Sequence, residues 1–244
     1  SNHLPTVAEK NHLKHHKIKE TVLNHAVSGS LLHDLPDQIA AALDEYHLIK
    51  KNKHHHEHIF FIACAGENDL SNGQPIDTIL QSFHNVITNV FNESKCETKP
   101  HLIFFGPKLE PCVIDDESVR KSYFQLSERF SAACQELKVQ VTQDHNDHHR
   151  HEESTHHCHS DGKNISYIDC LTMFCGHSSG VKGAILNGEV KPEALYFDRD
   201  GLHLNEAGYR VWKDQVENLL STILCTERCE DSLDMSHTKN CLSD

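Results

Sequence analysis

Residues 58–65 (HIFFIACA), followed by residues 66–69 (GEND), decide the fold of this 244-residue chain. An unbroken apolar run of this length that stops at a glycine is typical of a strand in a parallel sheet, covered by helices on both faces. Polar residues directly after such a strand lie in a loop at its carboxyl end, where the active groups of open α/β sheets gather. This stretch therefore predicts both a sheet and the edge of it at which function is expected.

Strand-like and helix-like segments alternate along the rest of the chain. Apolar side chains recur at helical spacing in some segments and form short continuous runs in others. Alternation of this kind predicts an α/β fold with a parallel sheet and helices on both faces. The expected strands are residues 20–26, 58–65, 101–106 and 165–171, and the expected helices are residues 35–46, 76–91, 119–137 and a last helix capped by Asn205.

Two hydrophilic stretches interrupt the alternation. Residues 143–163 have almost no apolar side chain, which predicts a solvated, mobile insertion between a helix and a strand. Residues 225–244 are polar and lack an apolar stripe, which predicts a loosely packed, cysteine-containing tail. We therefore expect one domain over residues 1–224, with its insertion at 143–163, followed by the tail.

The composition argues against two classes of partner. The formal net charge is -13, with 23 Lys and Arg against 36 Asp and Glu. Nucleic-acid affinity depends largely on basic side chains that displace counterions, so a nucleic-acid partner is not expected. The longest apolar run, residues 59–65, is far shorter than the roughly 20 residues that a membrane span needs, so no span is expected.

Three expected loops at strand ends carry polar residues that suggest acyl-transfer chemistry. Asp200 and His203 are three residues apart in a turn before the last helix, so the carboxylate can accept a hydrogen bond from one ring nitrogen. The other ring nitrogen then serves as a general base. Asn68 offers amide donors and Gly29 a backbone N–H for a developing oxyanion. Each motif alone also occurs in ordinary turns, so the interpretation depends on their order along the chain.

That order resembles the SGNH (GDSL-like) hydrolase superfamily over nearly the whole chain. The resemblance is carried by a glycine turn after the first expected strand, by GEND at 66–69, and most specifically by DGLHLNEAGY at 200–209. It implies a three-layer α/β/α sandwich on a flavodoxin-like parallel sheet of about five strands, and ester hydrolysis through an acyl-serine intermediate. By resemblance, Gly29 and Asn68 would hold the oxyanion, and Asp200 would orient His203 as general base and then general acid.

The resemblance also sets expectations for the neighbours of Asn68 and for the substrate. We expect Glu67 to be replaceable without consequence and Asp69 to fix its loop rather than react. The implied substrate is a small-molecule carboxylic ester, such as the acetyl ester of a sugar or the acyl ester of a lipid. This chemistry needs no metal or other cofactor.

One block of the family pattern is not found in the chain, namely a buried strand that ends in Gly-Asp-Ser. In the family this strand lies between the first two strands expected here. The absence favours a fragment whose first strand lies upstream, with residues 4–16 as the helix after the nucleophile. Ser1 is then the candidate nucleophile, as the last residue of a broken block, and a serine further upstream is the alternative. Ser28 and Ser30 are disfavoured, because their loop contributes its backbone in the family pattern.

Histidines gather in two tracts, and these support a second hypothesis. Their density is sufficient to bind zinc, nickel or copper in solution, but a structural site needs paired ligands on a rigid frame. The alternative function is therefore a catalytically inactive SGNH-fold interaction module that binds metal or a partner through these tracts. The histidines concerned are His54, His55, His56, His156, His157 and His159.

Overall fold

A computed structural model describes residues 21–50, 58–92, 100–147, 164–175 and 182–238. Their centre is a parallel sheet of three strands, and every pair of neighbours in it is parallel. The strands are β1 (Ile59–Cys64), β2 (Pro100–Phe105) and β3 (Asn164–Ile168), in that spatial order. This arrangement confirms the predicted α/β class with a parallel sheet.

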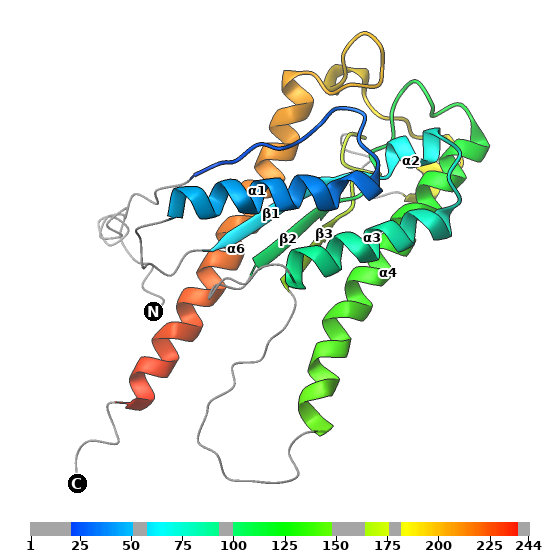
Figure 1. The fold of residues 1–244 in the computed structure, drawn as a ribbon. Helices are drawn as coiled ribbons and strands as arrows, with labels where there is room; N and C mark the ends of the chain where they lie inside the picture. Colours follow the sequence, from blue (N-terminus) through cyan, green and yellow to red (C-terminus); the bar gives the residue numbers. More distant parts are fainter. Residues whose placement is uncertain (1–20, 51–57, 93–99, 148–163, 176–181, 239–244) are drawn as a thin grey trace, which may run out of the picture.

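Helices cover both faces of the sheet (Figure 1). The apolar sides of α1, α3 and α4 pack together on one face, and α6 packs on the other. The helices are α1 (Leu35–Lys50), α2 (Glu67–Ser71), α3 (Ile76–Asn92), α4 (Glu117–Asp147), α5 (Lys182–Leu186) and α6 (Glu206–Thr238), with short 3-10 helices at η2 (Leu32–Asp34) and η4 (Ala194–Tyr196).

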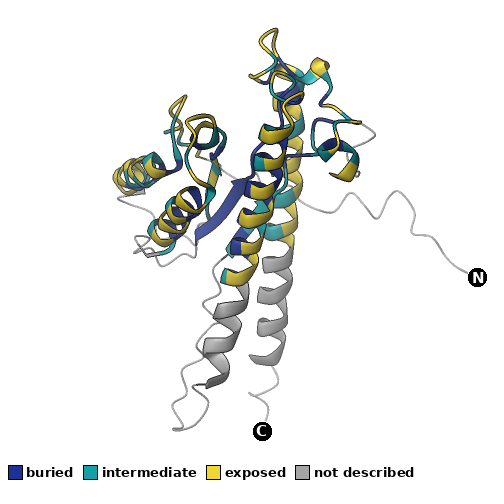
Figure 2. Ribbon diagram, turned by 90° about the vertical axis from the view of Figure 1, so that its right-hand side faces the viewer, coloured by how far each residue is buried: buried dark blue, intermediate teal, exposed yellow. Residues whose placement is uncertain are grey.

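The core is centred on β2, whose six residues are all buried. On the α3 and α4 face, the rings of Phe83, Phe104 and Phe130 lie 4.5 to 5.1 Å apart between centroids. Burying each such side chain contributes roughly 1.5–3 kcal/mol. On the α6 face, Trp212 packs against Phe105 at 5.2 Å. Figure 2 shows this buried strand between the helices, in agreement with the buried strand expected at residues 101–106.

β1 differs from this prediction because one of its edges and part of one face are open. It pairs with β2 along one edge, and no described residue pairs with the other edge. On the α6 face, Phe60 joins the apolar cluster around Trp212, but Ile62 is 53% exposed. The expectation that this strand is covered on both faces is therefore wrong for β1. The physical reason is that α6 packs mainly over β2 and β3 and does not reach Ile62.

Residues 21–26 do not form the expected strand. They are coil, and the segment continues into a turn at Ser28 and Gly29. Glu20, where this strand was expected to begin, lies outside the described residues. The coil runs beside α1 (Figure 1), to which His25 is joined by a 2.8 Å contact between its Nε2 and Glu45 Oε2. A strand needs a neighbouring strand to satisfy its backbone groups, and no described strand lies next to this segment.

Two helices extend beyond their predicted ends. α4 continues to Asp147, so residues 143–147 are helical and not the start of an insertion, and α6 continues to Thr238, through most of the predicted tail. Neither helix contains a proline, and the only glycine is Gly208 in the first turn of α6. Because no helix-breaking residue occurs at the expected ends, the helices continue after their apolar stripes have stopped.

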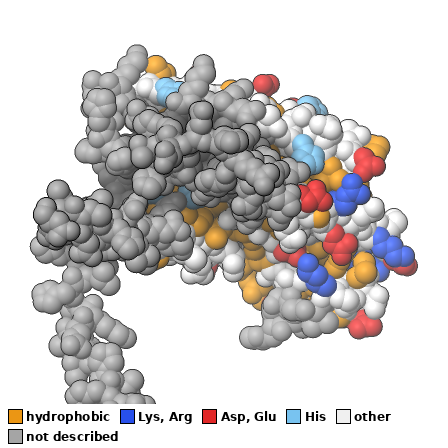
Figure 3. All heavy atoms as spheres, turned by 90° about the horizontal axis from the view of Figure 1, so that it is seen from below, with side chains coloured by type: hydrophobic (Ala, Val, Ile, Leu, Met, Phe, Trp, Pro, Cys, Tyr) orange, Lys and Arg blue, Asp and Glu red, His pale blue; other side chains and the backbone are white. Residues whose placement is uncertain are grey.

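The described helices bear on the expectation of no membrane span, and Figure 3 shows the charges on one face of the molecule. None of the described helices combines the length and the apolar character that crossing a bilayer requires. On the face shown in Figure 3, the visible acidic and basic side chains are interspersed, and the basic ones do not gather into one patch.

Candidate functional site

The carboxyl end of β1 leads directly into a polar helix start. Gly66 makes the turn with φ 112°, and a Cβ atom there would lie 3.1 to 3.2 Å from side-chain carbons of Phe130 and Leu126. A side chain at this position is therefore disfavoured both by the backbone conformation and by the packing. Glycine lets the chain turn sharply over the core, and Glu67 and Asn68 become the first residues of α2.

Asp200 and His203 form the hydrogen bond that their spacing predicts. Nδ1 of His203 lies 2.7 Å from Oδ2 of Asp200, and Oδ1 of Asp200 accepts hydrogen bonds from the backbone N–H groups of Leu202 and His203, at 2.9 and 3.0 Å. The bond with the imidazole, followed by these two, lowers the pKa of Asp200 to about 2. The His203 side chain is 63% exposed, and no described residue hydrogen-bonds to its Nε2. We call Asp200 and His203 the imidazole pair; their catalytic roles stay predictions.

Asn205 holds the loop that carries the imidazole pair. Its Oδ1 accepts hydrogen bonds from the backbone N–H groups of Ala207 and Gly208, at 2.9 and 3.2 Å, which confirms it as the N-cap of α6. Its Nδ2 donates to the carbonyls of Leu195 and Phe197, at 2.8 and 2.9 Å. One side chain therefore joins the start of α6 to the segment before the loop.

Asn68 contacts the loop that contains Gly29. Its Nδ2 donates to the carbonyl of Ser30 at 3.0 Å, and we call Asn68 and Ser30 the amide pair. Gly29 has φ 79° and is exposed in the turn. The Ser30 hydroxyl donates to the carbonyl of Val27 and accepts from Gln38, both at 2.8 Å. Ser30 is thus engaged in holding the loop, while the second N–H of the Asn68 amide has no described partner.

Asp69 fixes this loop, as the sequence predicts. Its side chain is fully buried, and both carboxylate oxygens accept from the backbone N–H of Leu32, at 3.3 and 3.1 Å. Burial raises the pKa of Asp69, and the Leu32 hydrogen bond opposes that rise. The carboxylate joins the start of α2 to the residues before α1, which are the two segments that carry the amide pair.

Glu67 belongs to a buried network that the sequence did not reveal. Its Oε1 accepts from the backbone N–H of Lys108 at 2.6 Å, and its Oε2 from Lys108 Nζ at 2.8 Å. Lys108 Nζ also donates to Glu110 at 2.7 Å, and the Tyr123 hydroxyl donates to the other oxygen of Glu110 at 3.0 Å. We call these four residues the buried network. These contacts argue against the expectation that Glu67 is replaceable without consequence, because its carboxylate holds the segment after β2.

The charges of the buried network depend on one another. Burial alone would lower the pKa of Lys108, but the carboxylates of Glu67 and Glu110 outweigh it, so the pKa of Lys108 lies above its ordinary value. Burial raises the pKa of Glu110, the charge of Glu67 adds to this, and Lys108 and Tyr123 oppose it. A buried charge without a partner is costly, so the lysine is what makes the two carboxylates tolerable there.

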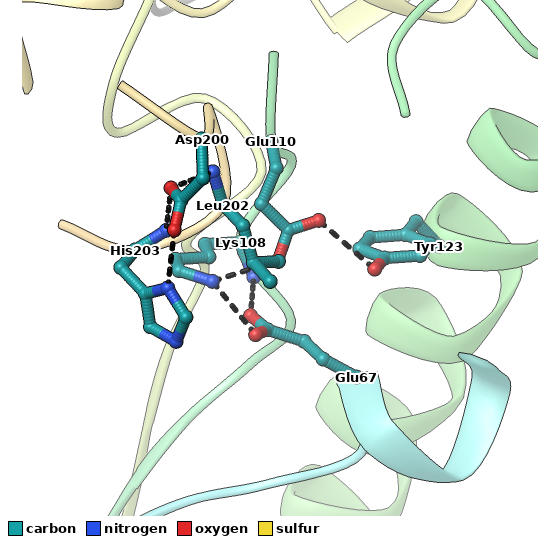
Figure 4. A network of polar contacts seen from close by, with 7 residues as sticks. All are labelled: Glu67, Lys108, Glu110, Tyr123, Asp200, Leu202 and His203. Atoms are coloured by element: carbon teal, nitrogen blue, oxygen red, sulfur yellow. Dashed lines mark hydrogen bonds and ion pairs between the residues drawn. The ribbon is translucent and has the colours of Figure 1, made fainter. Parts of the chain in front are cut away.

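The buried network is linked to the imidazole pair by a backbone contact and to the amide pair by adjacency in the chain. No hydrogen bond or ion pair within the described residues joins these two pairs directly. The carbonyl of Gly201, in the imidazole loop, accepts from the backbone N–H of Cys112 at 3.3 Å, two residues after Glu110. At the other end, Glu67 is adjacent to Asn68 in α2. Figure 4 shows the network together with the imidazole pair, with side chains from the loop before α6, from α2 and from α4.

The remaining candidate residues lie outside the described residues. This applies to Ser1, the candidate nucleophile, and to the histidines of both tracts, His54, His55, His56, His156, His157 and His159. Within the described part of the chain, no three His, Cys, Asp or Glu side chains are grouped so that they could hold a metal ion.

Comparison with known proteins adds no family. No protein-family model matches the chain, and no curated protein matches it.

Proposed function

We propose that this chain is an SGNH-type ester hydrolase that uses a serine, histidine and aspartate mechanism. The observation that carries the proposal is the imidazole pair: a carboxylate bound to Nδ1 of His203 at 2.7 Å, with Nε2 exposed and unpartnered in the described structure. An imidazole held in this way is suited to act as a general base. The imidazole pair follows the parallel sheet in chain order. Its loop is hydrogen-bonded to Cys112 in the segment after β2, on the carboxyl side of that strand, where α/β enzymes place their active groups.

The proposed reaction assigns each group one task. A serine hydroxyl attacks the ester carbonyl while Nε2 of His203 takes the hydroxyl proton, and His203 then returns this proton to the leaving alcohol. The backbone N–H of Gly29 and the free amide N–H of Asn68 hold the oxyanion of the tetrahedral intermediate. Water, activated by the same imidazole, releases the acid from the acyl-serine. Asp200 keeps the proton on Nδ1 so that Nε2 is free to act.

The open edge of β1 supports a position for the missing nucleophile block. A strand that pairs in parallel with this edge would end beside α2, and the residue after it would be near Asn68. It would also satisfy the backbone groups on the edge of β1 that has no partner among the described residues. The nucleophile in this proposal is Ser1 or a serine before it. The substrate is a small-molecule carboxylic ester, with a sugar acetyl ester and a lipid acyl ester as the two classes to test.

The test is hydrolysis of p-nitrophenyl acetate and octanoate by the full-length protein from its natural gene, compared with His203→Ala and Asp200→Asn. We expect kcat to fall by about 10⁴-fold in His203→Ala, because a triad without its base loses most of its rate. The control is His84→Ala, which removes an exposed histidine of α3 and should leave the rate unchanged. A fluorophosphonate probe followed by peptide mass spectrometry would identify the reactive serine.

Failure of this test would favour the alternative function. If the full-length protein and His203→Ala were equally inactive on a broad ester panel, and no serine reacted with the probe, the hydrolase proposal would be wrong. An interaction module that uses its histidine tracts would then be the better hypothesis, and zinc binding by the same protein would be the next measurement.

A further inference from the structure

The buried network is more polar than its position requires. Lys108 is 7% exposed and Glu110 is fully buried, yet three ionisable side chains meet there. Replacing a buried ion pair by apolar side chains of similar volume is often neutral or stabilising, so stability alone does not account for the charges. What charged hydrogen bonds add is direction, because they fix the distance and the angle between the segments they join.

Both ends of the network lead to a residue of the proposed site. Glu67 is followed directly by Asn68, so the two hydrogen bonds from Lys108 also hold the first turn of α2. Glu110 lies two residues before Cys112, whose backbone N–H donates to the imidazole loop. Tyr123 anchors Glu110 to α4, which packs on the core and gives the network a rigid support.

We propose that Lys108 is a positioning residue: by clamping Glu67 to Glu110, it fixes the amide of Asn68 relative to the imidazole of His203. The catalytic consequence rests on the proposed function, in which the amide of Asn68 holds the oxyanion while the imidazole of His203 transfers the proton in the same step. The mechanical part of the proposal, that the two loops are held together through Lys108, is independent of the chemistry.

A fixed separation affects the rate more than substrate binding. The imidazole and the amide must both be in place when the tetrahedral intermediate forms, and a misplacement of about 1 Å can cost about 10²-fold in rate. The affinity for the ester in its ground state depends less on the separation between the imidazole and the amide. Loss of the clamp should therefore lower kcat and leave KM nearly unchanged, as expected when an interaction acts mainly in the transition state.

The test combines hydrogen exchange with kinetics on the full-length protein. Lys108→Met removes the clamp, and amide exchange is followed by mass spectrometry in the peptides that cover residues 66–72 and 198–205. A second variant makes the whole network apolar, with Glu67→Met, Lys108→Met, Glu110→Met and Tyr123→Phe together, so that loss of stability is separated from loss of position. The matched control is Lys191→Met, which removes an exposed lysine that pairs with Asp115.

We expect Lys108→Met to raise exchange in both peptides and to lower kcat by about 10²-fold at nearly constant KM. The apolar variant should have a melting temperature near that of the wild-type protein but keep the lowered kcat. Lys191→Met should change neither amide exchange nor kcat. Wild-type kcat in the apolar variant, or faster exchange in only one peptide or in neither, would overturn the proposal. If the wild-type protein shows no hydrolysis that depends on His203, the proposed function fails, and the exchange data still decide whether Lys108 joins the loops.

Discussion

The same edge of the sheet carries two acid and base arrangements that differ in burial. In the buried network, the side chains of Lys108 and Glu110 are 9% and 1% exposed. In the imidazole pair, those of His203 and Asp200 are 63% and 49% exposed. Burial makes the first a fixed part of the fold, because water cannot replace the partners of its charges. Exposure leaves the second accessible to a substrate and makes its contribution to stability small.

The two arrangements also shift the pKa values of their carboxyl groups in opposite directions. Burial and the neighbouring Glu67 raise the pKa of Glu110, whereas hydrogen bonds to the His203 ring and to two backbone N–H groups lower the pKa of Asp200. Position in the fold, and not residue type, thus decides how each acid responds to pH. This difference can be tested by stability measurements that do not depend on any enzymatic activity.

The largest effect should come from Lys108→Met. This variant leaves the buried Glu110 and the partly buried Glu67 without their cation, and breaking a buried pair in this way costs about 3–5 kcal/mol. Urea denaturation at pH 7 should show that decrease in the free energy of unfolding. Lys191→Met, at an exposed pair, should change it by about 0–1 kcal/mol. Equal effects of the two variants would remove the distinction between buried and exposed charges.

A smaller effect is expected from Asn205, which holds the imidazole loop by neutral hydrogen bonds. Asn205→Ala removes the cap of α6 and the two hydrogen bonds to the carbonyls of Leu195 and Phe197. The expected loss is about 2 kcal/mol, roughly 1 for the cap and the rest for the other bonds. Asn205→Asp keeps the capping acceptor but places a carboxylate against two carbonyls, so it should not restore stability. Full recovery in Asn205→Asp would show that only the cap matters.

Glu110→Gln should change how stability depends on pH. Because the pKa of Glu110 is raised, the folded protein holds a proton that the unfolded chain releases above the ordinary glutamate value of about 4.3. This contribution is complete below that value and is lost as pH rises toward and through the raised folded value, with a slope of at most about 1.4 kcal/mol per pH unit. Denaturation at a series of pH values from 4 upward should give a flatter curve for Glu110→Gln. An unchanged slope would mean that Glu110 is ionised throughout.

The apolar pattern predicted most of the described fold, because it depends on local periodicity. The runs at β1, β2 and β3 and the stripes of α1, α3 and α4 lie where the pattern placed them, although β3 ends at Ile168 and not at residue 171. The errors have non-local causes. Residues 21–26 have strand composition, but they lack a described strand to pair with. The ends of α4 and α6 carry no helix-breaking residue, so the end of an apolar stripe was not the end of a helix.

The candidate site was predictable only where its contacts are short in sequence. Asp200 and His203 are three residues apart, so their hydrogen bond follows from the turn that contains them. Glu67 and Lys108 are 41 residues apart, and a glutamate in the first turn of a helix needs no partner to be explained. The only signal of this network in the sequence was Glu67, an acid without an evident partner inside the Gly66-Glu67-Asn68 motif. The fold was needed to show that its partner is Lys108.

The smallest effect on stability should come from Asp200→Asn. The pKa of Asp200 is lowered to about 2, so the ionised carboxylate contributes stability above the unfolded value of about 3.9. That contribution is lost as pH falls from there through about 2, which is the opposite direction to Glu110. Because the carboxylate is exposed, solvent and salt screen it, and the free energy of unfolding at pH 7 should barely change. Denaturation of the wild-type and variant proteins between pH 5 and pH 2 would show the two curves converging as the pH falls. A loss at pH 7 as large as that of Lys108→Met would mean that the exposed pair holds the fold as firmly as the buried one.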